Sequence, residues 1–330
     1  MSQSTVSRVI NRHASVREET RINVERAMAE LGYIPNAAAR SLITRHTRLL
    51  GLVVSNITNG FYPEIIDAIT SAALDAGYAV IVGSAGERPS SQAEYLRLLA
   101  EQRVDGAILT STLVGDARDL EALSRGGLPI VLANRLRDDL ALDAVALDNP
   151  EAGYLATSHL IDHGRRRIAY VGGRADAATD QGRFAGYSRA LDEGGIEMLP
   201  ELVAHGEFTR AFGRTRTAEM IGRASAMDGI IAGDDTVALG CLDALAEAGV
   251  RVPTDVGIIG FDDIPAASLR SVWLTTVSSS AIEMGALALS LLLDRVRDGF
   301  DGPPRRVIIP PELMVRGSCG AHESVVSDRK

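Results

Sequence analysis

The stretch DVGIIGFDD (255–263) decides the fold class of this 330-residue chain. It sets a short run of Val, Ile and Gly between polar residues and ends on two aspartates. Six further runs have the same form: LLGLVVS (49–55), YAVIVG (78–83), DGAILTS (105–111), LPIVLAN (128–134), RIAYVGG (167–173) and DGIIAGD (228–234). Continuous apolar runs of this length are typical of strands buried on both faces of a parallel sheet.

Helical periodicity separates these runs, as in SQAEYLRLLAEQ (91–102) and TVALGCLDALAEAG (236–249). The alternation occurs twice, before and after DNPEAG (148–153). It therefore predicts an α/β protein with two similar, doubly wound parallel-sheet subdomains. Since ligands bind at the carboxyl ends of such strands, two facing subdomains would form a cleft lined by the loops that follow the strands.

Charge is unevenly distributed along the chain. The formal net charge is -9, yet residues 1–48 hold eight Arg and four Glu, so this head is +4 and the remainder is -13. A basic head on an acidic body indicates one segment that approaches phosphates. Cys241 and Cys319 are far apart without a CxxC pair, which argues against a zinc site and a disulfide framework. With no signal peptide and no apolar run of about 18 residues, we expect a soluble, cytoplasmic protein.

The sequence of the head predicts several short helices. Ser2 can cap a helix whose apolar residues Val6, Val9 and Ile10 share one face. Polar and Arg side chains on the rest of such a helix suit base edges and phosphates. The bland alternative is a solvent-exposed helical cap with incidental Arg.

Two more helices are predicted in the head. Ser15 and Glu18 have capping-box spacing, and Gly32 would end the helix that they begin. A third helix of about seven residues would follow Asn36, and so short a helix needs a partner to stay folded. The polar tail at 321–330 is predicted to be disordered.

Polar side chains follow the predicted strands: Asn134, Arg135, Asp234, Asp235, Asp262 and Asp263. Together with Arg183 and the aromatic residues Phe61, Tyr62 and Phe208, they suit a polyhydroxylated ring, because acids accept from hydroxyls, Arg donates and aromatic faces stack. A sugar or sugar derivative fits these groups better than a nucleobase. The alternative for each residue alone is a helix cap or a hydrated loop position.

Catalysis is the less favoured interpretation of these acids. Paired carboxylates could serve a glycosidase, but nothing else in the sequence supports hydrolysis. His159 and His163 in HLIDH lack the glutamate of an HExxH motif, and the sequence holds no P-loop, no GxSxG and no GxGxxG after a strand. We therefore expect no enzyme activity, no cofactor and no metal.

Several motifs together carry a family resemblance: STVSRVIN, ELGYIPNAAARSL, LLGLVVSNITNGFY, DNPEAG, RRRIAYVGG, GRFAGYSRAL, AGDDTVALG, VGIIGFDD, LTTV and LMVRGS. In order and spacing they resemble the LacI/GalR family of bacterial transcription regulators over almost the whole chain. Each motif alone is weak, but the set is specific.

The resemblance implies a helix-turn-helix head at 1–48 with a hinge helix at about 36–43. It implies a sensor like a periplasmic sugar-binding protein, with subdomains at 49–149 plus about 278–308 and at 150–277 plus about 309–320. It also implies a homodimer on pseudo-palindromic operator DNA, without a membrane partner.

Residue roles follow from the same resemblance. Gln3, Ser4 and Arg8 match positions that meet bases, while Thr5, Ser7, Asn11 and Tyr33 match positions that meet phosphates. Leu42 matches the hinge leucine that wedges into the minor groove, and we group Asn36 and Arg40 with it. The positions matching effector contacts are Phe61, Tyr62, Asn134, Arg135, Thr179, Arg183, Phe208, Asp234 and Asp262. Asp234 stands where relatives often have Asn, so the preferred ligand could differ from theirs.

Two departures from the family pattern concern the head. Relatives usually have a further helix in front, which packs on the recognition helix, so we hypothesise that the protein begins upstream of Met1. Arg17 replaces the usual capping Ser, so Ser15 is expected to cap instead. We interpret the chain as an effector-responsive repressor. The alternatives are the solute-binding protein of a transporter and a sensor of this fold that no longer binds DNA.

Overall fold

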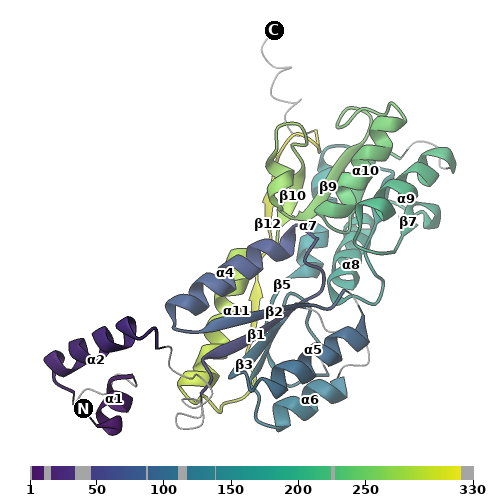
Figure 1. The fold of residues 1–330 in the computed structure, drawn as a ribbon. Coiled ribbons are helices and arrows are strands. Elements are labelled where there is room, and N and C mark those ends of the chain that lie inside the picture. The colour runs from purple at the N-terminus through teal and green to yellow at the C-terminus, as the bar shows by residue number, and fades with distance from the viewer. Residues whose placement is uncertain are drawn as a thin grey trace. The chain divides into compact units, whose positions relative to one another are not determined.

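The computed structural model describes residues 2–10, 16–33, 46–86, 88–110, 117–137, 139–223 and 227–320. The chain forms two compact units, Met1–Thr47 and Arg48–Lys330, which are described separately (Figure 1). Among the described residues, no helix has the length and apolar character needed to span a membrane.

The first unit contains helices α1 (Gln3–Ile10) and α2 (Glu18–Glu30), which contact each other. Val9 of α1 and Val24 of α2 are its buried apolar side chains among the described residues. The Ser2 hydroxyl accepts from the Thr5 amide at 3.3 Å, as expected for a helix cap.

Gly32 ends α2, as predicted. Its φ of 59° lies in the left-handed region that glycine adopts without strain. The prediction for the start of α2 is wrong, because the cap position is Arg17, without a side-chain hydrogen bond, and the helix begins only at Glu18. Glu18 and Glu19 in its first turn offer the favourable charge at this end.

The second unit contains two six-stranded sheets. The first has strand order β11-β5-β4-β3-β1-β2, and the second has order β12-β10-β9-β8-β6-β7. The first-sheet strands are β1 (Leu49–Val54), β2 (Ala79–Ser84), β3 (Gly106–Leu109), β4 (Ile130–Ala133), β5 (Asp143–Leu147) and β11 (Arg306–Ile309). The second-sheet strands are β6 (Ile168–Val171), β7 (Val203–Ala204), β8 (Gly229–Ala232), β9 (Gly257–Asp262), β10 (Thr275–Ser278) and β12 (Glu312–Met314).

All seven predicted apolar runs contain a strand, which confirms the α/β fold class. Neighbouring strands pair in parallel except β10 and β12, which are antiparallel. The chain passes from one sheet to the other three times, after β5, β10 and β11. We refer to the parts built on the two sheets as the first-sheet half and the second-sheet half.

Helices cover both faces of each sheet (Figure 1). They are α4 (Phe61–Asp75), α5 (Pro89–Glu101), α6 (Ala117–Arg125), α7 (Asn149–Asp162), α8 (Ala178–Glu193), α9 (Arg210–Arg223), α10 (Asp235–Glu247) and α11 (Ala281–Arg297), with short 3-10 turns at Pro200–Leu202 and Pro265–Ser268. On β1, Leu52 packs in the core with Ile65 of α4, whereas Val53 packs with Leu96 of α5. Burial on both faces explains why the strands are continuously apolar.

Helices α7 and α8 pack closely through glycine. A Cβ added at Gly186 of α8 would lie 2.0 Å from the Pro150 carbonyl oxygen, and one at Gly153 of α7 would lie 2.0 Å from the Arg183 carbonyl oxygen. Neither position can therefore accept a side chain without moving the helices apart. This close approach fixes α8, which carries Thr179 and Arg183, against α7.

Candidate functional site

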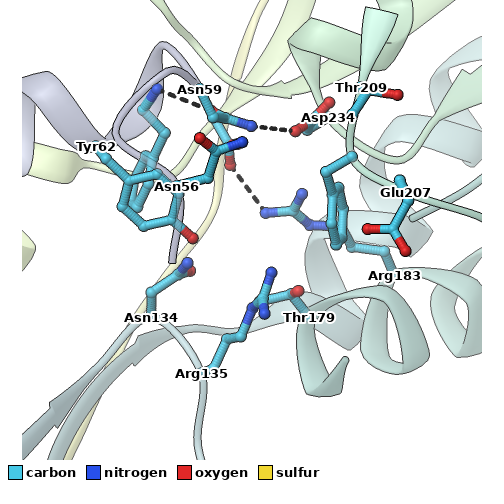
Figure 2. A pocket seen from close by; sticks show the side chains of 13 residues that line it. Asn56, Asn59, Tyr62, Asn134, Arg135, Thr179, Arg183, Glu207, Thr209 and Asp234 are labelled. Atoms are coloured by element: carbon cyan, nitrogen blue, oxygen red, sulfur yellow. Dashed lines mark hydrogen bonds and ion pairs between the residues drawn. The ribbon is translucent and has the colours of Figure 1, made fainter. Parts of the chain in front are cut away.

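A pocket lies between the two halves at the carboxyl ends of their strands (Figure 2). Its empty space is about 480 Å³, a figure that includes open solvent at its mouth. Thirteen residues line it: Asn56, Asn59, Phe61, Tyr62, Asn134, Arg135, Thr179, Arg183, Glu207, Phe208, Thr209, Asp234 and Asp262. All nine positions that the sequence assigned to an effector site are among them.

Both halves contribute side chains to the pocket. The first-sheet half supplies the loop after β1, the start of α4 and the turn after β4. The second-sheet half supplies the first turns of α8, the loop after β7, and residues that end or follow β8 and β9. Asn134 and Asp262 have positive φ values of 73° and 99°, and such strained backbone is concentrated at functional sites.

Arg183 is held from several sides. Its guanidinium donates to Asn149 Oδ1 at 3.0 Å, to the Gly233 carbonyl oxygen at 2.6 Å and to Asp262 Oδ1 at 3.0 Å. It also lies over the Phe261 ring, 4.5 Å from the centroid, and is 2% exposed. A guanidinium group fixed in this way holds its N–H donors in a defined orientation, as recognition of a polar ligand requires.

Asp234 caps α10 inside the pocket. Its Oδ1 accepts from the Val237 amide at 2.7 Å, and its Oδ2 accepts from Asn59 Nδ2 at 2.8 Å (Figure 2). Burial, and the nearby negative charge of Asp262, raise the pKa of Asp234 to about 6. The pocket therefore contains a carboxylate that is only partly compensated, which can accept from a ligand hydroxyl.

Phe208 forms an aromatic wall of the pocket. Its ring lies against the backbone of Gly173, where an added Cβ would be 2.0 Å from Phe208 Cζ, and Arg135 lies over the same ring at 5.5 Å. The Gly206 amide donates to the Gly173 carbonyl oxygen at 3.0 Å. The loop after β7 is thereby attached to the loop after β6.

The buried carboxylate of Asp180 strengthens this attachment. It accepts from the Gly173 amide at 2.6 Å and from the Tyr170 hydroxyl at 2.9 Å, and it pairs with His205 Nδ1 at 2.6 Å. Burial raises the pKa of Asp180, although these three donors oppose the shift. His205 precedes Phe208 by three residues, so the network supports the aromatic wall from behind.

Sequence reasoning missed four pocket residues: Asn56, Asn59, Glu207 and Thr209. Asn59 and Asn56 belong to SNITNGFY, directly after a predicted strand, and that position was the available signal for them. Glu207 and Thr209 follow β7, which has only two residues and no apolar run to announce it. Among the described residues, no group of three or more His, Cys, Asp or Glu is arranged to hold a metal ion.

The predicted DNA-binding residues lie in the first unit. Gln3, Ser4, Thr5, Ser7 and Arg8 are all on α1, where Arg8 is exposed, and Tyr33 follows α2 with 51% of its surface exposed. Asn11, Asn36, Arg40 and Leu42, together with the predicted hinge helix and the tail at 321–330, fall outside the described residues.

Comparisons with known proteins agree over nearly the whole chain. Residues 1–36 match the family described as bacterial regulatory proteins, lacI family, and residues 157–319 match the periplasmic binding protein-like domain. The HTH-type transcriptional repressor PurR of Vibrio atlanticus is 36% identical over 323 residues, covering 96% of this chain and 95% of the relative. This chain belongs to the LacI family of bacterial regulatory proteins.

Further members support the same assignment. The HTH-type transcriptional regulator RegA of Clostridium saccharobutylicum is 35% identical over 320 residues, with 96% of each chain covered. The solved structure of the regulator CelR in complex with cellobiose is 33% identical, with a TM-score of 0.76 and 96% of each chain covered. The lac repressor dimer bound to operator and the anti-inducer ONPF is 27% identical, with a TM-score of 0.85 over 97% of this chain and 96% of that chain. The family resemblance of the sequence is thus confirmed.

Proposed function

We propose that this LacI-family member is an effector-responsive transcriptional repressor whose pocket binds a small polar ligand, most simply a sugar or sugar derivative. The observation that carries the proposal is the convergence on one pocket of the nine residues that match effector-contact positions of the family. Support comes also from the relatives, which are repressors and regulators by name and include a cellobiose complex.

The chemistry of the pocket favours a polyhydroxylated ring. Asp234 and Asp262 can accept from hydroxyls, Arg135 and Arg183 can donate to ring or hydroxyl oxygens, and Phe208 offers a flat apolar face. We expect the nine effector positions assigned from the sequence to contact the ligand, with Asn56, Asn59, Glu207 and Thr209 beside them.

DNA binding belongs to the proposal for the first unit. The exposed Arg8 of α1 and the polar residues around it would meet operator DNA, with the predicted hinge helix in the minor groove and the protein acting in the cytoplasm as a homodimer. Ligand binding would close the pocket, change the relation of the two copies and so alter operator affinity, as coupling between two sites requires.

Calorimetric titration tests the ligand assignment. A panel of mono- and disaccharides is titrated beside a panel of purines, and we expect micromolar binding by at least one sugar and none by the purines. Arg183→Ala should weaken that binding by about thirtyfold or more, because it removes a buried, charged donor. Arg216→Ala is the matched control, since Arg216 lies on α9, is exposed and pairs with Glu219 outside the pocket.

Fluorescence anisotropy with a selected operator, at stated salt, tests the regulatory half of the proposal. Specific binding should change by at least about fivefold when the ligand is added, the lower end of ordinary allosteric coupling. Arg8→Ala should weaken operator binding and leave the calorimetric ligand affinity unchanged. Tight sugar binding without any effect on DNA would favour the solute-binding alternative, and purine binding in place of sugar would overturn the ligand class.

A further inference from the structure

A hydrogen bond crosses the pocket and joins two side chains that are 175 residues apart. Asn59, in the loop after β1 of the first-sheet half, donates from Nδ2 to Asp234 Oδ2 of the second-sheet half at 2.8 Å (Figure 2). The two residues are only 7% and 2% exposed. We refer to this contact as the cross-pocket hydrogen bond.

Both partners are fixed by other bonds, so their polarity is defined. Asn59 Oδ1 accepts from the Phe61 amide at 3.1 Å, which leaves Nδ2 to point at Asp234. Asp234 Oδ1 accepts from the Val237 amide at 2.7 Å, which leaves Oδ2 to accept from Asn59. Rotating the Asn59 amide by half a turn would place like atoms together and lose these bonds.

The neighbouring backbone shows that the halves meet closely at this point. A Cβ added at Gly60 would lie 3.1 Å from three atoms of the Ile264 side chain, which follows β9 of the second-sheet half. This apolar contact is not directional and tolerates sliding. The cross-pocket hydrogen bond is directional, and because its atoms are buried, breaking it without opening the pocket would leave a carboxylate oxygen without a donor.

We propose that Asn59 is a positioning residue that orients the Asp234 carboxylate and holds the two halves together, and thereby sets the fraction of closed protein before any ligand binds. A ligand that binds the closed form has an apparent affinity proportional to that fraction. Loss of the bond therefore lowers the affinity for every ligand of the pocket by the same factor. A direct ligand contact would instead discriminate among ligands.

A side-chain exchange gives a sharp test. Asn59→Asp places two carboxylates against each other across the pocket and should open it. Adding Asp234→Asn to that variant restores the bond with reversed polarity. The carboxylate introduced at position 59 then accepts from the Phe61 amide and from the side-chain amide introduced at position 234, whose oxygen still accepts from the Val237 amide.

Two single variants complete the set. Asn59→Ala removes the bond without adding repulsion. Thr58→Ala is the control, because Thr58 is exposed and its side chain bonds Asn56 within the same loop.

The closed fraction is measured without ligand, from the distance between two spin labels on the 330-residue chain. Labels are placed through Glu94→Cys on α5 and Asp192→Cys on α8, both exposed, while Cys241 and Cys319 are fully buried and escape labelling. Asn59→Ala should lower the ratio of closed to open protein by about fivefold, and Asn59→Asp by more than about tenfold. The double variant and Thr58→Ala should stay within about threefold of the parent, which is the expected spread of a near-neutral substitution.

Two results would overturn the proposal. The first is an unchanged distance distribution in both Asn59→Ala and Asn59→Asp. The second is a double variant as open as Asn59→Asp alone, which would show that the exchanged side chains are not bonded across the pocket. Because no ligand enters this measurement, it stands or fails separately from the proposed function; only the uniform loss of affinity rests on that function.

Discussion

Asp143 and Asp234 are both buried aspartates in parallel-sheet halves, and their environments shift their pKa in opposite directions. Asp143, at the start of β5, receives two bonds of 2.7 Å from Arg295 and further bonds from the amide and guanidinium of Arg305. Its pKa falls to about 2, because the hydrogen bonds from the two arginines outweigh burial. Asp234 has amide donors from Asn59 and Val237, and its pKa rises to about 6.

The difference separates a carboxylate that stabilises the fold from a carboxylate that is available to a ligand. Asp143 has its acceptor capacity filled by the protein and ties α11 and the chain before β11 to β5. Asp234 retains free acceptor capacity in the pocket and carries a charge that the protein compensates only in part. Keeping such a buried carboxylate ionised costs free energy, and carboxylates with pKa values shifted in this way are concentrated at functional sites.

The largest expected effect is on stability. Asp143→Ala leaves the mostly buried Arg295 without its carboxylate and Arg305 with Asp294 alone, and should lower the free energy of unfolding by about 3 kcal/mol. Urea unfolding followed by circular dichroism measures it, with Asp255→Ala as control, since Asp255 pairs with Arg251 at the surface. Equal midpoints for Asp143→Ala and the parent would show that the two-arginine site contributes no net stability.

A second prediction concerns pH and has opposite signs at the two aspartates. The raised pKa of Asp234 means that the folded protein holds a proton there which the unfolded chain releases, so stability from this group rises as pH falls through about 6. The gain should be about 1 kcal/mol between about pH 7 and about pH 5. Stability from Asp143 is complete above the ordinary Asp pKa of 3.8 and is lost as pH falls through about 2.

Unfolding midpoints measured across that pH range check this second prediction. Asp234→Asn should reduce the rise between about pH 7 and about pH 5, and Asp143→Asn should reduce the loss at lower pH, to which Asp255, whose pKa is also lowered to about 2, contributes as well. A parent-like pH profile in Asp234→Asn would mean that another group, such as Asp180 or Asp235, carries the proton.

The sequence predicts the sheets well because their physical cause is local. Strands buried on both faces need continuous apolar runs, and these are visible at all seven places where they were predicted. Five strands were not predicted: β5, β7, β10, β11 and β12. They have only two to five residues each. The start of α2 was wrong for a different reason: the cap position is Arg17, which makes no side-chain cap hydrogen bond, and the helix begins at Glu18 with acidic residues in its first turn.

The pocket was predictable only in part. Residues that follow strands converge because parallel strands end at the same edge, and this rule together with the family resemblance found nine of the lining positions. Asp235 and Asp263 also follow strands but do not line the pocket. Their bonding could not be predicted, because it joins residues distant in the chain, as Asn59 with Asp234 or Asp143 with Arg305. The periodic patterns of the sequence are local and do not indicate such pairs.

The smallest effect is expected at Asp180, whose surroundings lie between those of the other two aspartates. It has three donors in Gly173, Tyr170 and His205, but no arginine. His205→Ala should loosen the loop that carries Phe208 and weaken ligand binding by about threefold to fivefold, the effect of one lost hydrogen bond. His205→Asn, whose amide can reach the position of Nδ1, should recover most of the affinity.

Calorimetry with the sugar identified in the titrations measures both His205 variants. We expect Asp180 to act on the pocket through the loop that carries Phe208. The loss of ligand affinity should therefore be larger for ligands that cover the Phe208 ring than for ligands that do not. An equal loss for all ligands in His205→Ala, without recovery in His205→Asn, would place Asp180 with Asp143 as a purely stabilising carboxylate. Recovery of ligand affinity in His205→Asn would instead group Asp180 with Asp234, because the hydrogen bond from position 205 would then support the ligand pocket.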